Sequence, residues 1–110
     1  MIFEVDNLNN EIFIDLQSNK LYPKYYNMFA KYEYEGNGYC WEGHIEQILD
    51  DLQPELLDQI EFDPEAGSLT IISDDQKILK TVSELLNPIF EDLETLKSWI
   101  SKANRDRIED

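Results

Sequence analysis

The chain has 110 residues, 42% hydrophobic content and a formal net charge of -15, because 24 Asp and Glu side chains outnumber 9 Lys and Arg. This length suits one hydrophobic core, so we expect a single domain over residues 1–110. The negative charge argues against direct binding to nucleic acid or anionic lipid, and no apolar run is long enough to span a bilayer. We expect a cytoplasmic protein without an internal disulfide, because Cys40 is its only cysteine.

Two short strands are predicted near the N-terminus. The runs MIFEVD and EIFIDL alternate apolar and polar residues, and NLNN between them favours a turn. The alternation places Ile12, Ile14 and Leu16 on one face of the second strand. Glu11 and Asp15 share the other face. The pattern therefore predicts a hairpin with one buried face.

Two helices are predicted next. Aromatic residues recur at helical spacing from about residue 22 to residue 34, which indicates a first helix rich in tyrosine. Gly36 suits the position just after a helix, and Asn37 suits the N-cap of a second helix that runs to about residue 52. The second helix has one apolar stripe, formed by Trp41, Ile45, Ile48, Leu49 and Leu52.

A second hairpin and a last helix follow. The run QIEFDPEAGSLTIIS has two alternating segments around a turn. Ser73 and Gln76 have the spacing of a capping box, and helical periodicity continues across Asn87 and Pro88, where we expect a kink or a brief restart. The polar tail after about residue 102 is expected to fray. The order β-β-α-α-β-β-α predicts an α+β fold, with helices covering one face of an antiparallel sheet.

The Gly-Asn-Gly turn at residues 36–38 has two interpretations. Glycine N–H groups at a helix N-terminus can bind a phosphate. However, no Lys or Arg occurs between Lys31 and Lys77, and no βαβ pattern precedes the turn. A tight connection between two helices is the better interpretation.

Two further chemical sites can be weighed against structural roles. Cys40 and His44 are four residues apart and could pair as nucleophile and base, but the acidic surroundings disfavour a thiolate. A packed cysteine and a partly exposed histidine are the expected roles. Carboxylates between residues 50 and 58 could ligate a metal, but they lack the spacing of a calcium loop. We expect no catalytic residue, no bound metal and no cofactor.

The acidic face of the second helix is the strongest functional candidate. Glu42, Glu46 and Asp50 are like charges at four-residue spacing, and each neighbouring pair costs about 0.2 to 0.5 kcal/mol. Folding alone gives no reason for this arrangement. Exposed aromatic residues near the turn would be of the types that anchor protein interfaces. The predicted partner-binding residues share negative or aromatic character: Glu35, Tyr39, Glu42, Glu46 and Asp50.

The segment YEGNGYCWEGHIEQIL resembles the signature of the immunity protein 51 family of bacterial polymorphic-toxin systems. The matching positions lie in and around the glycine turn: Tyr34, Gly36, Asn37, Gly38, Tyr39, Trp41 and Glu42. A Met-Phe pair, Met28 and Phe29, precedes them, and the order of elements over most of the chain is similar. Beyond residue 52 the similarity is general in character. A structural role is expected for four of the motif residues: Gly36, Asn37, Gly38 and Trp41.

The resemblance implies a non-enzymatic antidote that binds a cognate toxin domain and blocks it in the producing or neighbouring cell. The family is not tied to one toxin activity. From the charge we infer a basic toxin such as a nuclease. The alternative is an acidic nucleic-acid mimic, or an adaptor, that occupies a basic groove of a host or phage protein. A mimic would bind several basic proteins, whereas an antidote would select its toxin; the oligomeric state is left open.

Overall fold

The computed structural model describes residues 1–108. Two strands, β1 (Val5–Asp6) and β2 (Glu11–Asp15), precede two helices, α1 (Lys24–Ala30) and α2 (Gly38–Leu52). A short 3₁₀ helix, η1 (Pro54–Gln59), leads to β3 (Glu61–Pro64) and β4 (Ser68–Ile72). The last elements are α3 (Gln76–Phe90), α4 (Leu93–Lys102) and the 3₁₀ turn η2 (Arg105–Arg107). The predicted α+β fold is confirmed.

The four strands form one antiparallel sheet in the order β1-β2-β4-β3. Both predicted hairpins are present, and β2 pairs with β4 so that Ile12 lies opposite Ile71 and Ile14 lies opposite Leu69. The register gives one face of the sheet only apolar strand residues: Val5, Ile12, Ile14, Phe62, Pro64, Leu69 and Ile71. Cross-strand apolar pairs of this kind stabilise a sheet and join the two hairpins.

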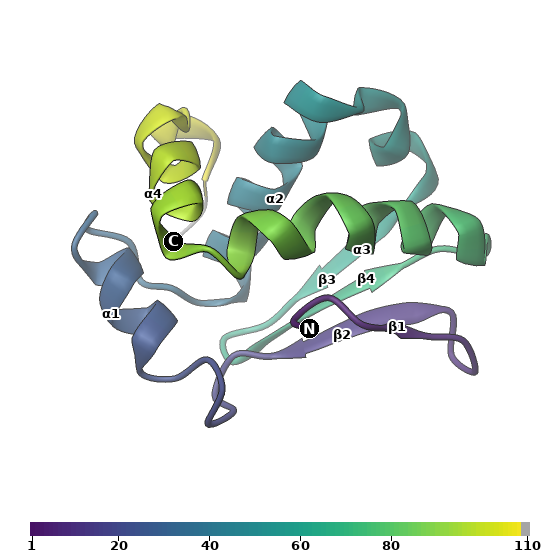
Figure 1. The fold of residues 1–110 in the computed structure, drawn as a ribbon, viewed down its shortest axis with the longest axis horizontal. Helices are drawn as coiled ribbons and strands as arrows, with labels where there is room; N and C mark the ends of the chain where they lie inside the picture. The colour runs from purple at the N-terminus through teal and green to yellow at the C-terminus, as the bar shows by residue number, and fades with distance from the viewer. Residues whose placement is uncertain (109–110) are drawn as a thin grey trace.

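The helices lie on the apolar side of the sheet. Figure 1 shows α2 and α3 over one side of the strands, with α1 beyond their ends and α4 beside α2. A helix packs its apolar stripe against the apolar face of a sheet, because both surfaces are then removed from water. Within residues 1–108, none of these helices covers the opposite side of the sheet.

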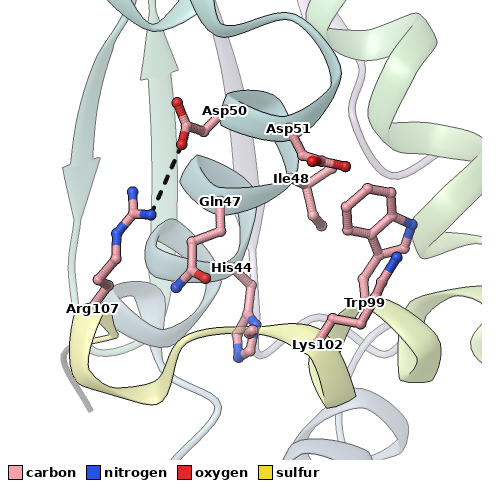
Figure 2. A pocket seen from close by; sticks show the side chains of 9 residues that line it. His44, Gln47, Ile48, Asp50, Asp51, Trp99, Lys102 and Arg107 are labelled. Carbon is pink, nitrogen blue, oxygen red and sulfur yellow. Dashed lines mark ion pairs between the residues drawn. The ribbon is translucent and has the colours of Figure 1, made fainter.

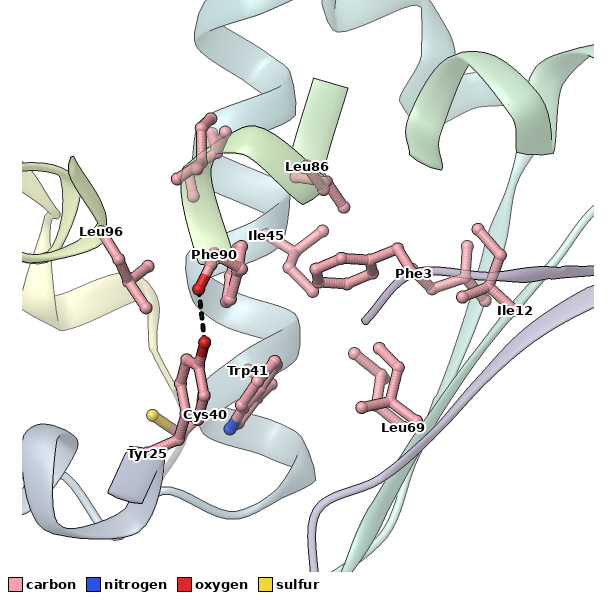
Figure 3. Packing of buried hydrophobic residues seen from close by; sticks show 14 of the residues in the cluster. Phe3, Ile12, Tyr25, Cys40, Trp41, Ile45, Leu69, Leu86, Phe90 and Leu96 are labelled. Carbon is pink, nitrogen blue, oxygen red and sulfur yellow. Dashed lines mark hydrogen bonds between the residues drawn. The ribbon is translucent and has the colours of Figure 1, made fainter. Parts of the chain in front are cut away.

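Trp41 lies in the core between the helices and the sheet (Figure 3). Its ring stacks on Phe90 with 5.0 Å between the centroids, and the ring of Phe29 lies 5.9 Å away. Asn87 of α3 holds the N-terminal segment, because its side chain accepts from the Phe3 N–H at 2.8 Å and donates to the Phe3 carbonyl oxygen at 3.0 Å. These contacts connect α2 to α3, and α3 to the N-terminal segment that precedes β1.

Helix α1 is shorter than the predicted span of residues 22–34. Tyr22 precedes Pro23, and a residue before proline disfavours helical backbone angles. At the other end, α1 stops at Ala30, and Glu33 in the turn that follows has a φ angle of 66°, in the left-handed region that a helix cannot continue through. Gly36 has the positive φ angle that was predicted, 70°, but it lies in the loop before α2 and not directly after α1 as expected.

The start of α3 differs from the predicted capping box. Asp75 caps the helix by accepting from the Lys77 N–H at 2.9 Å. The hydroxyl of Ser73 accepts from the Asp75 N–H instead. Gln76 is not available for a capping box, because its amide donates to the Asn7 carbonyl oxygen in the first hairpin at 2.8 Å. A long-range contact has replaced the local one.

The last helical region breaks after Phe90 rather than at Asn87 and Pro88. Proline removes one backbone hydrogen bond, but α3 continues through Pro88 and ends two residues later, at Phe90. Asp92 then caps α4 by accepting from the Glu94 N–H at 3.2 Å. The predicted restart is present, but the aspartate determines its position.

Leu52, the last residue of the apolar stripe predicted for α2, is not buried. Leu52 is 44% exposed, whereas Leu56 in η1 is 1% exposed and enters the core in the next turn. The element η1 was not predicted from sequence. None of the helices formed by residues 1–108 is both long and apolar enough to cross a membrane.

Candidate partner-binding surface

The glycine turn fixes the start of α2 on the sheet. The Asn37 side chain accepts from the Cys40 N–H at 2.9 Å, which is the predicted N-cap. Gly38 donates its N–H to the Glu65 carbonyl oxygen at 2.9 Å. A Cβ atom on Gly38 would lie 2.2 Å from that oxygen and from the Ser68 carbonyl oxygen. Glycine at this position therefore lets α2 rest directly on the turn between β3 and β4.

Four of the predicted partner-binding residues lie along one line of α2. We call this line, formed by Tyr39, Glu42, Glu46 and Asp50, the α2 flank. Arg107 reaches it, with its guanidinium nitrogens 3.5 Å from Glu46 and 3.9 Å from Asp50. The structure therefore supplies a folding reason for two of the like charges that the sequence left unexplained.

The fifth predicted residue, Glu35, lies apart from the α2 flank. It precedes the helix and accepts a hydrogen bond from the Asn37 side chain at 3.2 Å. Beside it, a cavity of about 260 Å³ is lined by Tyr22 and Tyr26, which are 49% and 47% exposed. Their rings are 5.5 Å apart. The helical spacing predicted from sequence included Tyr22 and either Tyr25 or Tyr26; the amphipathic side chain of tyrosine suits a surface as well as a core.

Residues 103–108 pack against α2 instead of fraying as their polarity predicted. Ile108 is only 9% exposed, and a Cβ atom on Gly43 would lie 3.0 Å from its Cγ1 atom. The Asn104 N–H donates to the Gln47 side chain at 2.7 Å, and that side chain donates back to the Asn104 carbonyl oxygen at 2.9 Å. A glycine inside a helical pattern can indicate a close approach of this kind. The remaining part of the predicted fraying segment, residues 109–110, lies outside the described residues.

Cys40 and His44 are both buried. Cys40 is fully buried as predicted, so its thiol is not accessible to a substrate. The prediction of a partly exposed His44 is wrong, because the ring is 2% exposed and packs between Phe29 and Tyr34 at centroid distances of 5.2 and 4.8 Å. Burial, with a smaller effect from the positive charge of Arg105, lowers the pKa of His44 to about 4. The imidazole is therefore neutral at pH 7.

A cavity of about 340 Å³ lies between α2 and the C-terminal segment (Figure 2). The buried Nε2 atom of His44 has no hydrogen-bond partner among the described residues. Asp50 and Asp51 also line the cavity, and the Lys102 ammonium lies 4.0 Å from the centre of the Trp99 ring. Within residues 1–108, no group of three or more His, Cys, Asp or Glu side chains could hold a metal ion.

The fold and composition define the class of protein: an α+β protein with an antiparallel sheet covered on one side by helices and with a formal net charge of -15. A family model described as Immunity protein 51 matches residues 3–105. The match covers nearly the whole chain, so the chain belongs to the immunity protein 51 family. No curated protein and no solved structure gave a significant match. Proteins of an immunity family neutralise toxins and are generally not enzymes.

Proposed function

We propose that this protein binds a cognate bacterial toxin domain and neutralises it in the cytoplasm through an acidic surface. Membership of the immunity protein 51 family is the observation that carries the proposal. The net charge of -15 supports the proposal that the binding surface is acidic. An immunity protein acts by occupying its toxin, so the expected activity is tight binding and not catalysis.

The charge favours a basic toxin, such as a nuclease. A nuclease has cationic groups that hold phosphates, and an acidic protein can occupy the same groups. Opposite charges also raise the association rate, and this increase falls as the salt concentration rises. The predicted contacts Glu35, Tyr39 and Glu42 offer part of such a surface. Glu46 and Asp50 would have to exchange Arg107 for a cation of the toxin.

Co-expression tests the proposal. The toxin domain encoded immediately upstream is expressed in bacteria with and without this protein, and growth is measured. We expect growth arrest by the toxin alone, rescue by the protein, and a complex that co-purifies. A matched control replaces the toxin with a toxin domain of similar charge from an unrelated system, which should not be neutralised. Toxicity that persists in the presence of the folded protein would contradict the proposal.

A second measurement separates an antidote from a nucleic-acid mimic. Binding to the upstream toxin and to an unrelated basic nuclease is measured with and without added DNA. An antidote binds the upstream toxin at least a hundredfold more tightly than the unrelated nuclease. Similar affinities for both proteins, with DNA competing equally, would favour the mimic.

A further inference from the structure

The side of the sheet turned away from the helices carries five acidic residues and no basic residue on its strands. We call its strand residues the outer sheet face: Asp6, Glu11, Phe13, Asp15, Glu61, Asp63, Ser68, Thr70 and Ile72. All the acidic residues of the four strands lie on this face, and the strands contain no Lys or Arg. Because side chains alternate between the two faces of a strand, the pattern that makes the inner face apolar places the acidic residues on the outer sheet face.

An aromatic side chain lies in the middle of the outer sheet face. Phe13 belongs to β2, an inner strand, yet its side chain is 54% exposed. It lies opposite Thr70, while Ile72 lies in the next row between Glu11 and Glu61. Apolar residues in the centre with charged residues around them are typical of a protein-binding surface.

Folding explains only part of the charge on this face. Asp6 and Asp15 stabilise turns, because their carboxylates accept backbone N–H groups of Leu8 and Gln17 at 3.0 Å. Hydrogen bonds from the Asn9 side chain and the Leu8 N–H also hold the pKa of Asp6 below its usual range.

Three other acids of the outer sheet face have no such role. Within residues 1–108, the carboxylates of Glu11, Glu61 and Asp63 make no hydrogen bond or ion pair. Glu11 also lies directly opposite Asp6, and like charges in that position destabilise a sheet. These three carboxylates are available to a cation from another molecule, in contrast to Glu46 and Asp50.

We infer that the outer sheet face is the main docking surface for the toxin domain proposed above, and that the toxin presents Lys or Arg side chains around an apolar site that receives Phe13. The inference rests on the proposed function. The charge decides the occupant, because a second copy of the chain would bring the same carboxylates face to face and would be repelled. A basic partner satisfies both the carboxylates and the exposed ring.

Matched variants test this surface against the α2 flank. The sheet variant combines Glu11→Gln, Glu61→Gln and Asp63→Asn, and the flank variant combines Glu42→Gln, Glu46→Gln and Asp50→Asn. Both remove three negative charges, so long-range attraction weakens equally; the flank variant in addition removes the ion pairs of Arg107. Phe13→Thr removes the ring but keeps a good strand former. Leu8→Ser, at a residue that is 94% exposed in the first hairpin loop, is the control for loss of an exposed apolar side chain.

Dissociation constants for the upstream toxin are measured for the wild type and all four variants. We expect the sheet variant to bind at least tenfold more weakly than the flank variant. Phe13→Thr should weaken binding at least tenfold through faster dissociation, and Leu8→Ser should stay within twofold of the wild type. Equal losses in the two triple variants, or a Phe13→Thr variant within twofold of the wild type, would overturn the inference.

Carbodiimide labelling of the wild-type complex gives the same test without relying on variants that could fail to fold. The toxin should protect Glu11, Glu61 and Asp63 from labelling more strongly than it protects Asp50. Equal or weaker protection would overturn the inference, as would a dimer of the free protein that the toxin does not dissociate. If the wild type neither binds nor neutralises the toxin, the proposed function itself fails. Binding by the wild type without a contribution from the outer sheet face rejects only the docking surface.

Discussion

The α2 flank and the outer sheet face are both acidic, but they differ in what surrounds their carboxylates. On the α2 flank, Arg107 pairs with Glu46 and Asp50, so the C-terminal segment already supplies a cation. On the outer sheet face, Glu11 and Glu61 have no cation from within the described residues. Charge density in a sequence is therefore a poor guide to binding, because an internal partner can satisfy it.

The largest expected effect comes from the residue that joins the two regions. Gly38 places α2 against the turn between β3 and β4, and a Cβ atom there would overlap two backbone carbonyl oxygens at 2.2 Å. Backbone oxygens of a tight turn cannot move aside as a flexible side chain can. We expect Gly38→Ala to lower the free energy of unfolding by roughly 3 kcal/mol or more. Urea denaturation followed by circular dichroism measures the change.

Gly67→Ala is the matched control in the same hairpin turn. A Cβ atom on Gly67 would lie 3.2 Å from the side chain of Gln17, which can shift. The control should change the free energy of unfolding by less than about 1 kcal/mol. Equal effects of the two substitutions would show that the contact between Gly38 and the turn is not what holds the regions together.

Acid should weaken the α2 region through His44. Its pKa is about 4 in the folded protein and about 6.5 in an unfolded chain. A depressed folded-state pKa means that the unfolded state binds the proton first as pH falls, so its contribution to stability is complete above pH 6.5 and is lost between pH 6.5 and pH 4. The loss is about 3 kcal/mol. Carboxylate titration also changes stability in this range, so the comparison must be made with a variant.

His44→Phe provides that comparison, because it keeps an aromatic ring between Phe29 and Tyr34 but cannot take up a proton. Stability is measured by urea denaturation from pH 7 to pH 4. The difference between the wild type and the variant should move by about 3 kcal/mol in favour of the variant as the pH falls. Parallel curves for the two proteins would rule out His44 as the source of acid sensitivity.

Local patterns predicted the strands and the main helices, whereas contacts between distant segments determined the two surfaces. The alternation in β2 predicted that Glu11 and Asp15 share a face, and Asn37 was recognisable as an N-cap. The pairing of β2 with β4 could not be predicted from either hairpin alone. That pairing brings Phe13 beside Thr70 and makes one acidic face from two hairpins.

The surroundings of the α2 flank were predicted wrongly, because they too depend on contacts between segments distant in sequence. The polarity of residues 103–108 favours exposure to solvent. In the structure, however, Ile108 packs against Gly43 and holds the C-terminal segment on α2. From the pattern of α2 alone, His44 is expected at the edge of the apolar stripe and partly exposed. It is buried because α1, the loop after α1 and the C-terminal segment cover that side of the helix. Arg107 is distant from Glu46 in sequence, so their pairing has no local signal.

Substitution of Gly43 sharpens the comparison by disturbing the C-terminal segment alone. Alanine favours a helix over glycine by about 1 kcal/mol, but its Cβ atom would lie 3.0 to 3.2 Å from atoms of Ile108. We expect Gly43→Ala to displace residues 105–108 from α2, with a net change in stability within about 1 kcal/mol. Hydrogen exchange should become faster in residues 105–108 and stay unchanged in the strands.

Ile108→Ala is the companion variant, because it loosens the same contact from the other side. It should also speed exchange in the C-terminal segment, although it adds no helix-forming residue to α2. Unchanged exchange in Gly43→Ala would mean that the segment adjusts without leaving the helix. In that case the ion pairs of Arg107 would remain and the α2 flank would keep its internal cation.

The smallest expected effect concerns Arg107 itself. Its side chain and those of Glu46 and Asp50 are 45%, 45% and 50% exposed, so solvent screens the two ion pairs. Arg107→Ala should lower the free energy of unfolding by less than about 1 kcal/mol, and by less still in high salt. Arg107→Lys, which keeps the charge, is the control.

The same variant shows which acidic surface holds the toxin. Arg107→Ala leaves Glu46 and Asp50 without their internal cation, so a toxin that docks on the α2 flank would gain new partners and dissociate more slowly. A toxin that docks on the outer sheet face would dissociate at the wild-type rate and associate only slightly faster, because one positive charge is lost. We expect the second result, with the dissociation rate within twofold of the wild type in stopped-flow measurements. Slower dissociation would show that the toxin docks on the α2 flank.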